Sequence, residues 1–185
     1  MVAGDQLKRQ RLRVALKLML LIAVGFIVLV SMQQFSGQSD FGISGRSQVK
    51  DLSDVKPGTL ISFLWEDRPV LVYRRTSDDI DRLIDPSESM SKLVDPDSKK
   101  SLQPEFAKTA LRSFDREWFV AINQGTDFGC TLQLVDLPSV SLLRDTCRGS
   151  DYDLAGRVLS GHYATKNISI PQYTMEGETL ILGGN

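Results

Sequence analysis

The sequence predicts a mostly β protein: an antiparallel β domain with a small helical insertion, tethered to one N-terminal transmembrane helix. Three observations support this fold class. Residues 14–32 form an apolar run behind a basic segment, β-rich segments alternate with turn signals from residue 58 onward, and residues 77–113 contain helix-like spacing of apolar side chains. A chain of 185 residues suits one globular domain with a short additional element.

The first predicted element is the transmembrane helix over residues 14–32. Its 19 residues would span about 28 Å as a helix, close to the hydrocarbon thickness of a bilayer. Residues 1–13 are basic, which predicts a cytoplasmic N-terminus and a periplasmic C-terminal domain at a bacterial inner membrane, or the organellar equivalent. The alternative, a cleaved signal peptide, would require a small-residue cleavage site, and the residues after the apolar run do not supply one.

A flexible tether is predicted over residues 33–57, which are rich in Ser, Gly, Gln and Asp. The β domain is predicted over residues 58–185, with a mostly helical insertion at about 77–113. Strands are predicted at residues 59–64, 69–74, 117–123, 132–135, 140–143, 168–170 and 179–182.

Charge and motif content argue against several functions. Beyond residue 17 the chain has 17 basic and 22 acidic residues, so a nucleic-acid partner is not expected. The chain has a single histidine, His162, without an identifiable catalytic partner in the sequence, and we expect it to be an exposed surface residue. No glycine-rich loop follows a strand and opens a helix, so nucleotide binding has no support either.

The chain contains two cysteines, Cys130 and Cys147. On the outer face of a membrane two such cysteines are expected to pair. A bridge closing a loop of this length would stabilise the fold by about 3 kcal/mol. Because the two are far apart in sequence, a structural disulfide is favoured over a redox-active pair.

The segments around these cysteines carry a family resemblance. Residues 125–130, Gly-Thr-Asp-Phe-Gly-Cys, resemble the pattern C-T-H-L-G-C, and residues 145–150, Asp-Thr-Cys-Arg-Gly-Ser, resemble C-P-C-H-G-S. These are the two cluster loops of the Rieske iron–sulfur subunit of cytochrome bc complexes, the ubiquinol–cytochrome c reductase iron–sulfur subunit. Further resemblance lies in residues 68–76, 117–120, 151–158 and 166–171. Together these segments imply a Rieske-like domain.

The resemblance also implies where the cluster ligands would lie. In the family each loop supplies one Cys and one His to a two-iron two-sulfur cluster and one further Cys to a disulfide. The ligand positions correspond here to Gly125, Asp127, Asp145 and Arg148, and the disulfide positions to Cys130 and Cys147. Rieske ligation requires two thiolates and two imidazoles, whereas glycine has no side chain and arginine no lone pair. We therefore expect a degenerate member of the family, with no cluster and no metal.

An ion pair is the predicted replacement for the cluster. Arg148 is expected to pair with Asp127, Asp145 or both, bridging the two loops. The alternative is that all three side chains point into water. Ser150 and Tyr152 correspond to hydroxyl donors to sulfur in the family, and we expect them to serve the backbone of their own loops instead.

The predicted function is that of a non-catalytic, non-redox accessory subunit of a respiratory membrane complex. Its expected partners are cytochrome b or another haem-containing core, and the lipid bilayer through residues 14–32. One alternative is an electron-transfer subunit of a quinol–cytochrome c reductase with an atypical metal centre built from Asp127, Asp145 and His162. A second alternative is a free-standing periplasmic binding or assembly module.

Overall fold

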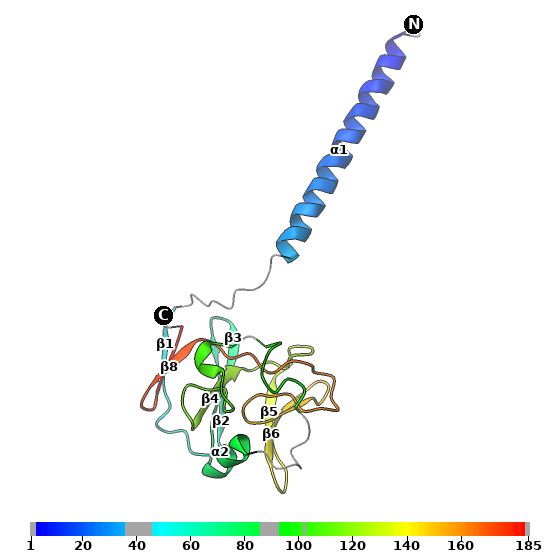
Figure 1. Cartoon of the computed structure of the whole chain (residues 1–185). Coiled ribbons are helices and arrows are strands. Elements are labelled where there is room, and N and C mark those ends of the chain that lie inside the picture. Colours follow the sequence, from blue (N-terminus) through cyan, green and yellow to red (C-terminus); the bar gives the residue numbers. More distant parts are fainter. Residues whose placement is uncertain (1–2, 36–45, 86–92, 102, 184–185) are drawn as a thin grey trace. The chain divides into compact units, whose positions relative to one another are not determined.

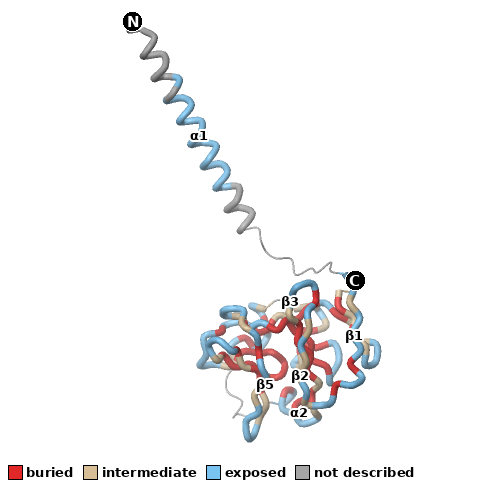
Figure 2. Tube along the Cα trace, turned by 180° about the vertical axis from the view of Figure 1, so that it is seen from behind, coloured by how far each residue is buried: buried red, intermediate tan, exposed pale blue. Residues whose placement is uncertain are grey.

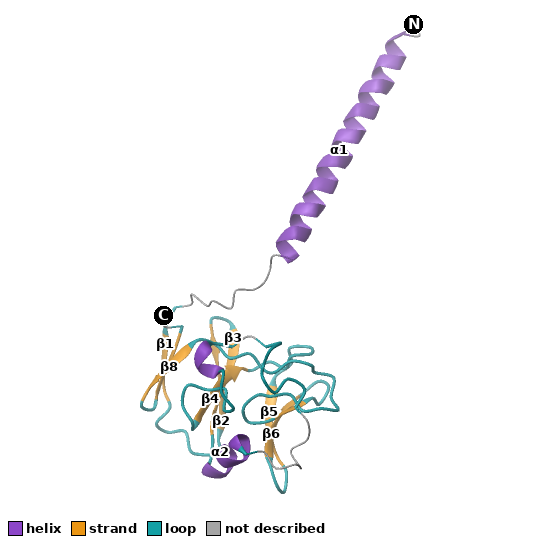
Figure 3. Ribbon diagram, viewed as in Figure 1, coloured by secondary structure: helices purple, strands orange, loops and turns teal. Residues whose placement is uncertain are grey.

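The computed structural model describes residues 3–35, 46–85, 93–101 and 103–183. Within these residues the chain forms nine strands in three small antiparallel sheets, with two α-helices and one 3-10 helix (Figures 1 and 3). The predicted mostly β, antiparallel fold is therefore confirmed. The chain divides into two compact units, Met1–Asp40 and Phe41–Asn185, which are described separately here.

Helix α1 (Ala3–Phe35) is the part of the first unit that the structure describes. It begins well before the predicted residue 14, because the Leu, Lys, Arg and Gln residues of the basic segment are themselves good helix formers. Its described side chains are exposed (Figure 2). No helix in the described part of the chain is both long enough and apolar enough to cross a membrane, so the predicted span over residues 14–32 is not confirmed.

The central sheet of the second unit is a meander of β2 (Leu60–Trp65), β3 (Arg68–Arg74) and β4 (Trp118–Ile122). The β2–β3 hairpin turns through Glu66 and Asp67, which both have positive φ, as a two-residue turn between antiparallel strands requires. Every residue of β4 is buried, and so are the middle residues of β3. This sheet forms the centre of the core (Figure 2).

A second sheet contains β5 (Leu132–Asp136), β6 (Ser141–Asp145) and β7 (Asp151–Tyr152). It positions the two loops that contain Cys130 and Cys147. The first loop, residues 124–131, leads into β5, and the second loop, residues 146–150, joins β6 to β7. The antiparallel register pairs Leu132 with Asp145, so the end of the first loop and the start of the second lie side by side.

The third sheet has the order β1 (Gln48–Asp51), β9 (Thr179–Leu182) and β8 (Tyr173–Glu176). Strand β1 lies inside the segment predicted as a tether, residues 33–57, of which residues 36–45 lie outside the described part. Packed structure thus begins before residue 58, because the β1 backbone pairs with β9 and the following Leu52 is fully buried.

The strand predicted at residues 168–170 is wrong. Ile168 and Ile170 are buried as strand residues would be, but their segment forms no continuous ladder of backbone hydrogen bonds with another described segment. The backbone N–H of Ile168 donates to Gly156 O at 2.9 Å, and Ser169 O accepts from Ile122 N at 3.0 Å. The alternation of apolar residues at 168–170 therefore predicts burial correctly but predicts a strand wrongly.

The predicted mostly helical insertion, residues 77–113, is only partly helical in its described portion. Helix α2 (Ser77–Ile84) forms as predicted, with a capping box between Thr76 and Asp79. The second predicted helix is reduced to a 3-10 turn, η1 (Glu105–Ala107). Side-chain hydrogen bonds replace helical ones in the rest: Asp95, for example, accepts from the backbone N–H of Lys99 at 2.9 Å. Residues 86–92 and 102 lie outside the described residues.

Two buried arginines join these elements. The guanidinium of Arg75, at the end of β3, donates to Leu154 O, Leu111 O, Arg116 O and Ser113 Oγ, at distances of 2.7 to 3.1 Å. Burial lowers the pKa of Arg75 to about 10. Arg112 likewise donates to the carbonyls of Ala155, Gly156 and Ile168. Each guanidinium thus binds the backbone of several loop segments that do not belong to a β-sheet.

Candidate functional site

The two loops are joined covalently. Cys130 and Cys147 form the expected disulfide, with their Cα atoms 6.0 Å apart. The first loop is also closed on itself, because Gly125 N donates to Cys130 O at 2.7 Å and Gly129 N donates to Gly125 O at 3.0 Å. The second loop is tied to the first through Thr146 N, which donates to Thr131 O at 3.1 Å. The disulfide and these backbone hydrogen bonds therefore hold the two loops together.

Asp145 lies beneath these loops and is only 2% exposed. Its Oδ1 accepts from the backbone N–H groups of Cys147 at 2.7 Å and Arg148 at 3.0 Å, which folds the second loop around the carboxylate. Its Oδ2 is buried and has no hydrogen-bond partner among the described residues. Oδ1 thus accepts two hydrogen bonds, whereas Oδ2 accepts none from the described residues.

Gly125 packs directly against this carboxylate. A Cβ atom at position 125 would lie 1.9 Å from Asp145 Oδ2 and 2.9 Å from its Cγ, far inside van der Waals contact. Only glycine fits opposite Asp145 in this conformation. The carboxylate therefore occupies the space in which a side chain at residue 125 would begin.

Arg148 crosses from the second loop to the first. Its Nη1 lies 3.1 Å from Asp127 Oδ2, with the two side chains 40% and 23% exposed. The guanidinium carbon lies 4.8 Å from the centroid of the Phe128 ring and 4.1 Å from that of Tyr163. Asp145 binds Arg148 only through the backbone N–H, so the structure contains one of the two predicted side-chain pairs.

The donor set at the four positions does not match Rieske ligation. Gly125, Asp127, Asp145 and Arg148 offer two carboxylates and a guanidinium, where a Rieske cluster requires two thiolates and two imidazoles. Asp127 is already paired with Arg148, and the Asp145 side chain fills the space beside Gly125. The residues present do not fit the cluster.

Comparison with known proteins identifies the family of this chain. No family model matches the sequence. The ubiquinol–cytochrome c reductase iron–sulfur subunit of Allochromatium vinosum is 28% identical over 97% of this chain and 89% of that protein. The chain is a Rieske relative. The predicted resemblance is confirmed.

Plant proteins show the same similarity over a shorter region. The mitochondrial cytochrome b-c1 complex subunit Rieske-1 of Nicotiana tabacum is 34% identical, over 72% of this chain and 46% of that protein. The corresponding subunit of Zea mays is also 34% identical and is covered over 44% of its length. The chain thus spans about half the length of these plant relatives. A solved structure, "Hyperthermophilic respiratory Complex III", aligns over 90% of this chain with a TM-score of 0.45 and 17% identity.

Two hydroxyls of this Rieske relative bind loop backbone, as predicted, although each binds a segment other than its own. The Tyr152 hydroxyl lies 3.0 Å from Thr126 N, which donates to it. Ser150 Oγ accepts from Ala164 N at 3.2 Å. Burial raises the pKa of Tyr152 above its ordinary value, which keeps the phenol protonated. Both hydroxyls therefore fix loop backbone.

His162 is not grouped with Asp127 and Asp145, the other two residues of the atypical metal centre considered above. Its Nε2 is 3.6 Å from Asp151 Oδ2, an oxygen that also accepts from Arg144 Nη2 at 2.8 Å. Asp127 is engaged by Arg148. Among the described residues, the group of side chains whose atoms lie close enough to hold a metal is Cys130, Asp145 and Cys147, and it does not include His162 or Asp127.

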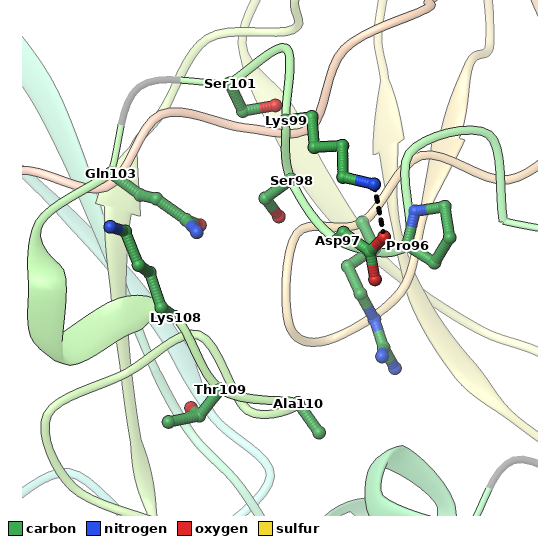
Figure 4. A pocket seen from close by; sticks show the side chains of 10 residues that line it. Pro96, Asp97, Ser98, Lys99, Ser101, Gln103, Lys108, Thr109 and Ala110 are labelled. Atoms are coloured by element: carbon green, nitrogen blue, oxygen red, sulfur yellow. Dashed lines mark ion pairs between the residues drawn. The ribbon is translucent and has the colours of Figure 1, made fainter.

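A cavity of about 660 Å³ is lined mostly by residues of the segment predicted as a helical insertion, residues 77–113 (Figure 4). Its charged lining groups already have partners: Lys99 Nζ lies 3.0 Å from Asp97, Lys108 Nζ 2.6 Å from Glu105, and Arg157 Nε 2.6 Å from Asp153. Figure 4 shows the Lys99–Asp97 pair on one side and Lys108 with Gln103 on the other. Because each of these cations has a carboxylate partner nearby, the described residues around the cavity present no concentrated charge to a ligand.

Gly125→Ala is expected to destabilise the domain by about 2 kcal/mol, because the new methyl group overlaps the Asp145 carboxylate. In an Asp145→Ala background the same substitution should cost at least about 1 kcal/mol less. Urea unfolding of the four proteins in this cycle measures the coupling. Additive effects of the two substitutions would show that the two residues do not meet as described.

The Arg148–Asp127 pair is expected to contribute modestly because it is partly exposed. A double-mutant cycle with Arg148→Ala and Asp127→Asn should give a coupling energy of about 0.5 kcal/mol, decreasing with added salt. Arg148→Ala should cost more than Asp127→Asn, since it also removes the contacts with two aromatic rings. Unchanged thermal stability of Arg148→Ala would contradict a bridging role.

Proposed function

We propose that this chain is a non-redox accessory subunit of a respiratory complex of the quinol–cytochrome c reductase type, derived from a Rieske subunit but without a two-iron two-sulfur cluster. Its partners would be cytochrome b or another haem-containing core. The proposal is supported by the names of the relatives, which are iron–sulfur subunits of such complexes. It is further supported by loops that retain their disulfide while all four ligand positions carry other residues.

The contact between Gly125 and Asp145 is the observation that carries the proposal. A degenerate loop whose ligands had merely been lost would leave space beside the missing side chains. Here a carboxylate fills that space and its other oxygen organises the second loop. This packing supports a pair of loops that holds together without a cluster.

Iron content and electron paramagnetic resonance test the absence of the cluster. The chain is produced in the same host, and purified in the same way, as the Allochromatium vinosum relative, which serves as the control for cluster assembly. We expect less than about 0.1 iron per chain for this protein and no Rieske-type signal after reduction. Stoichiometric iron with such a signal would contradict the proposal and favour an electron-transfer subunit.

Association with a respiratory complex is tested by mild solubilisation. Exposed apolar side chains of α1, such as Leu18, Leu21 and Phe26, favour contact with apolar surface of other subunits or surrounding lipid. We expect an affinity-tagged chain to co-purify with a b-type haem, detected by its absorption spectrum. A tagged chain that lacks residues 1–35 serves as the control and should lose much of this association. Recovery of the full chain alone, without haem, would favour the free-standing module.

A further inference from the structure

Three potential metal ligands meet where the two loops join. The sulfur atoms of Cys130 and Cys147 and a carboxylate oxygen of Asp145 all lie within 4.8 Å of one another. The three residues come from the first loop, the second loop and the end of β6, so the fold itself brings them together. Of the four positions at which the family holds its cluster, this group includes only Asp145.

Asp145 is prepared to act as a ligand. Two backbone N–H groups fix its Oδ1 at 2.7 and 3.0 Å and thereby orient the whole carboxylate. The remaining oxygen, Oδ2, is buried without a partner although the residue is only 2% exposed. A buried carboxylate oxygen without a donor is unfavourable, and a bound cation would satisfy it.

We propose that opening of the Cys130–Cys147 disulfide creates a binding site for one divalent cation of the zinc class, ligated by both sulfur atoms and the Asp145 carboxylate. A dithiol or phosphine reductant supplies two electrons, the S–S bond breaks, and two protons from solvent complete the two thiols. Binding of the cation releases both thiol protons to solvent, and a water molecule takes the fourth position. The oxidised chain has no thiolates and does not bind the cation.

The geometry suits a tetrahedral ion. Ligand atoms around Zn²⁺ lie about 3.6 to 3.8 Å apart, given Zn–S and Zn–O distances of about 2.3 and 2.1 Å. One carboxylate oxygen of Asp145 and the two sulfurs already lie within 4.8 Å of one another, so the loops need only a small opening that separates the sulfurs. Cys147 is exposed, which gives both the reductant and the cation access.

The nearby guanidinium does not oppose the cation. Arg148 Nη1 is directed to Asp127, 3.1 Å away, and the guanidinium carbon lies over the rings of Phe128 and Tyr163. Its positive charge is therefore balanced within the first loop. Two thiolates and one carboxylate give the site three negative charges for a divalent ion, with soft sulfur favouring zinc over magnesium or calcium.

Cobalt titration tests the site, because thiolate-bound tetrahedral Co²⁺ has intense charge-transfer and visible absorption. The full chain in mild detergent is reduced with a phosphine under anaerobic conditions and titrated with Co²⁺, and then with Zn²⁺. We expect one Co²⁺ per reduced chain, displacement by Zn²⁺, and no such absorption with the oxidised chain. Asp145→Asn should weaken Co²⁺ binding at least about tenfold, whereas Asp136→Asn on β5 should leave it unchanged.

Two results would overturn the proposal. One is a reduced chain that binds Co²⁺ no more tightly than the double variant Cys130→Ser/Cys147→Ser, and the other is an Asp145→Asn variant that binds as tightly as the parent. Because Asp145→Asn also alters the carboxylate that accepts two backbone hydrogen bonds of the second loop, a measurement on the unaltered chain is added. Zn²⁺ should raise the melting temperature of the reduced chain by roughly 5 °C and leave that of the oxidised chain unchanged, and a reduced chain without this rise would also refute the site.

Discussion

Replacement of Arg75 by methionine is expected to destabilise the β domain by at least about 4 kcal/mol. Methionine fills a similar volume but leaves the acceptors Leu154 O, Leu111 O and Arg116 O buried without donors. It also removes the stacking of the guanidinium 5.1 Å from the Phe119 ring centroid. Urea unfolding followed by circular dichroism measures the loss.

Two further variants make this prediction specific. Arg75→Lys retains the positive charge but cannot reach several carbonyls at once, so it should lose most of the same stability. Arg82→Met, on the exposed face of α2, should change stability by less than about 0.5 kcal/mol. A small effect of Arg75→Met would show that the loop segments around Leu111 and Leu154 are held by other contacts.

Removal of the Cys130–Cys147 bridge is expected to lower the free energy of unfolding by about 3 kcal/mol. The bridge restricts the unfolded chain, and it closes two loops that otherwise share few backbone hydrogen bonds. The double variant Cys130→Ser/Cys147→Ser and the phosphine-reduced parent should lose similar amounts when a chelator is present. Equal stability of the oxidised and reduced parent under those conditions would contradict a structural role for the disulfide.

The strands of the central sheet could be predicted from the sequence because their side chains are buried and β-branched or aromatic. β3 and β4 are examples, each close to its predicted bounds. Strands β1 and β8 were not predicted, because partly exposed edge strands are held by backbone pairing with a distant segment. Gln48, for example, lies opposite Leu182, and no local pattern records that pairing.

The candidate site also has features that the sequence predicts and features that only the structure shows. The cysteine pairing and the Arg148–Asp127 pair involve residue types whose chemistry limits their partners, so the sequence suffices to propose them. The packing of Gly125 against Asp145 and the approach of Tyr163 to Arg148 depend on how loops far apart in sequence meet. A glycine at residue 125 shows from the sequence only that this position has no side chain, whereas the structure shows that the Asp145 carboxylate packs against it.

The anchorage of the loop segments on Arg75 and Arg112 bears on how such a protein evolves. The hydrogen-bond acceptors of the two guanidinium groups all lie outside the first and second loops. The hydrogen bonds that anchor these segments therefore do not involve the two loops that correspond to the cluster loops of the Rieske relatives. Substitutions within the two loops therefore leave these hydrogen bonds in place, so the loops can vary in sequence while the neighbouring segments stay anchored.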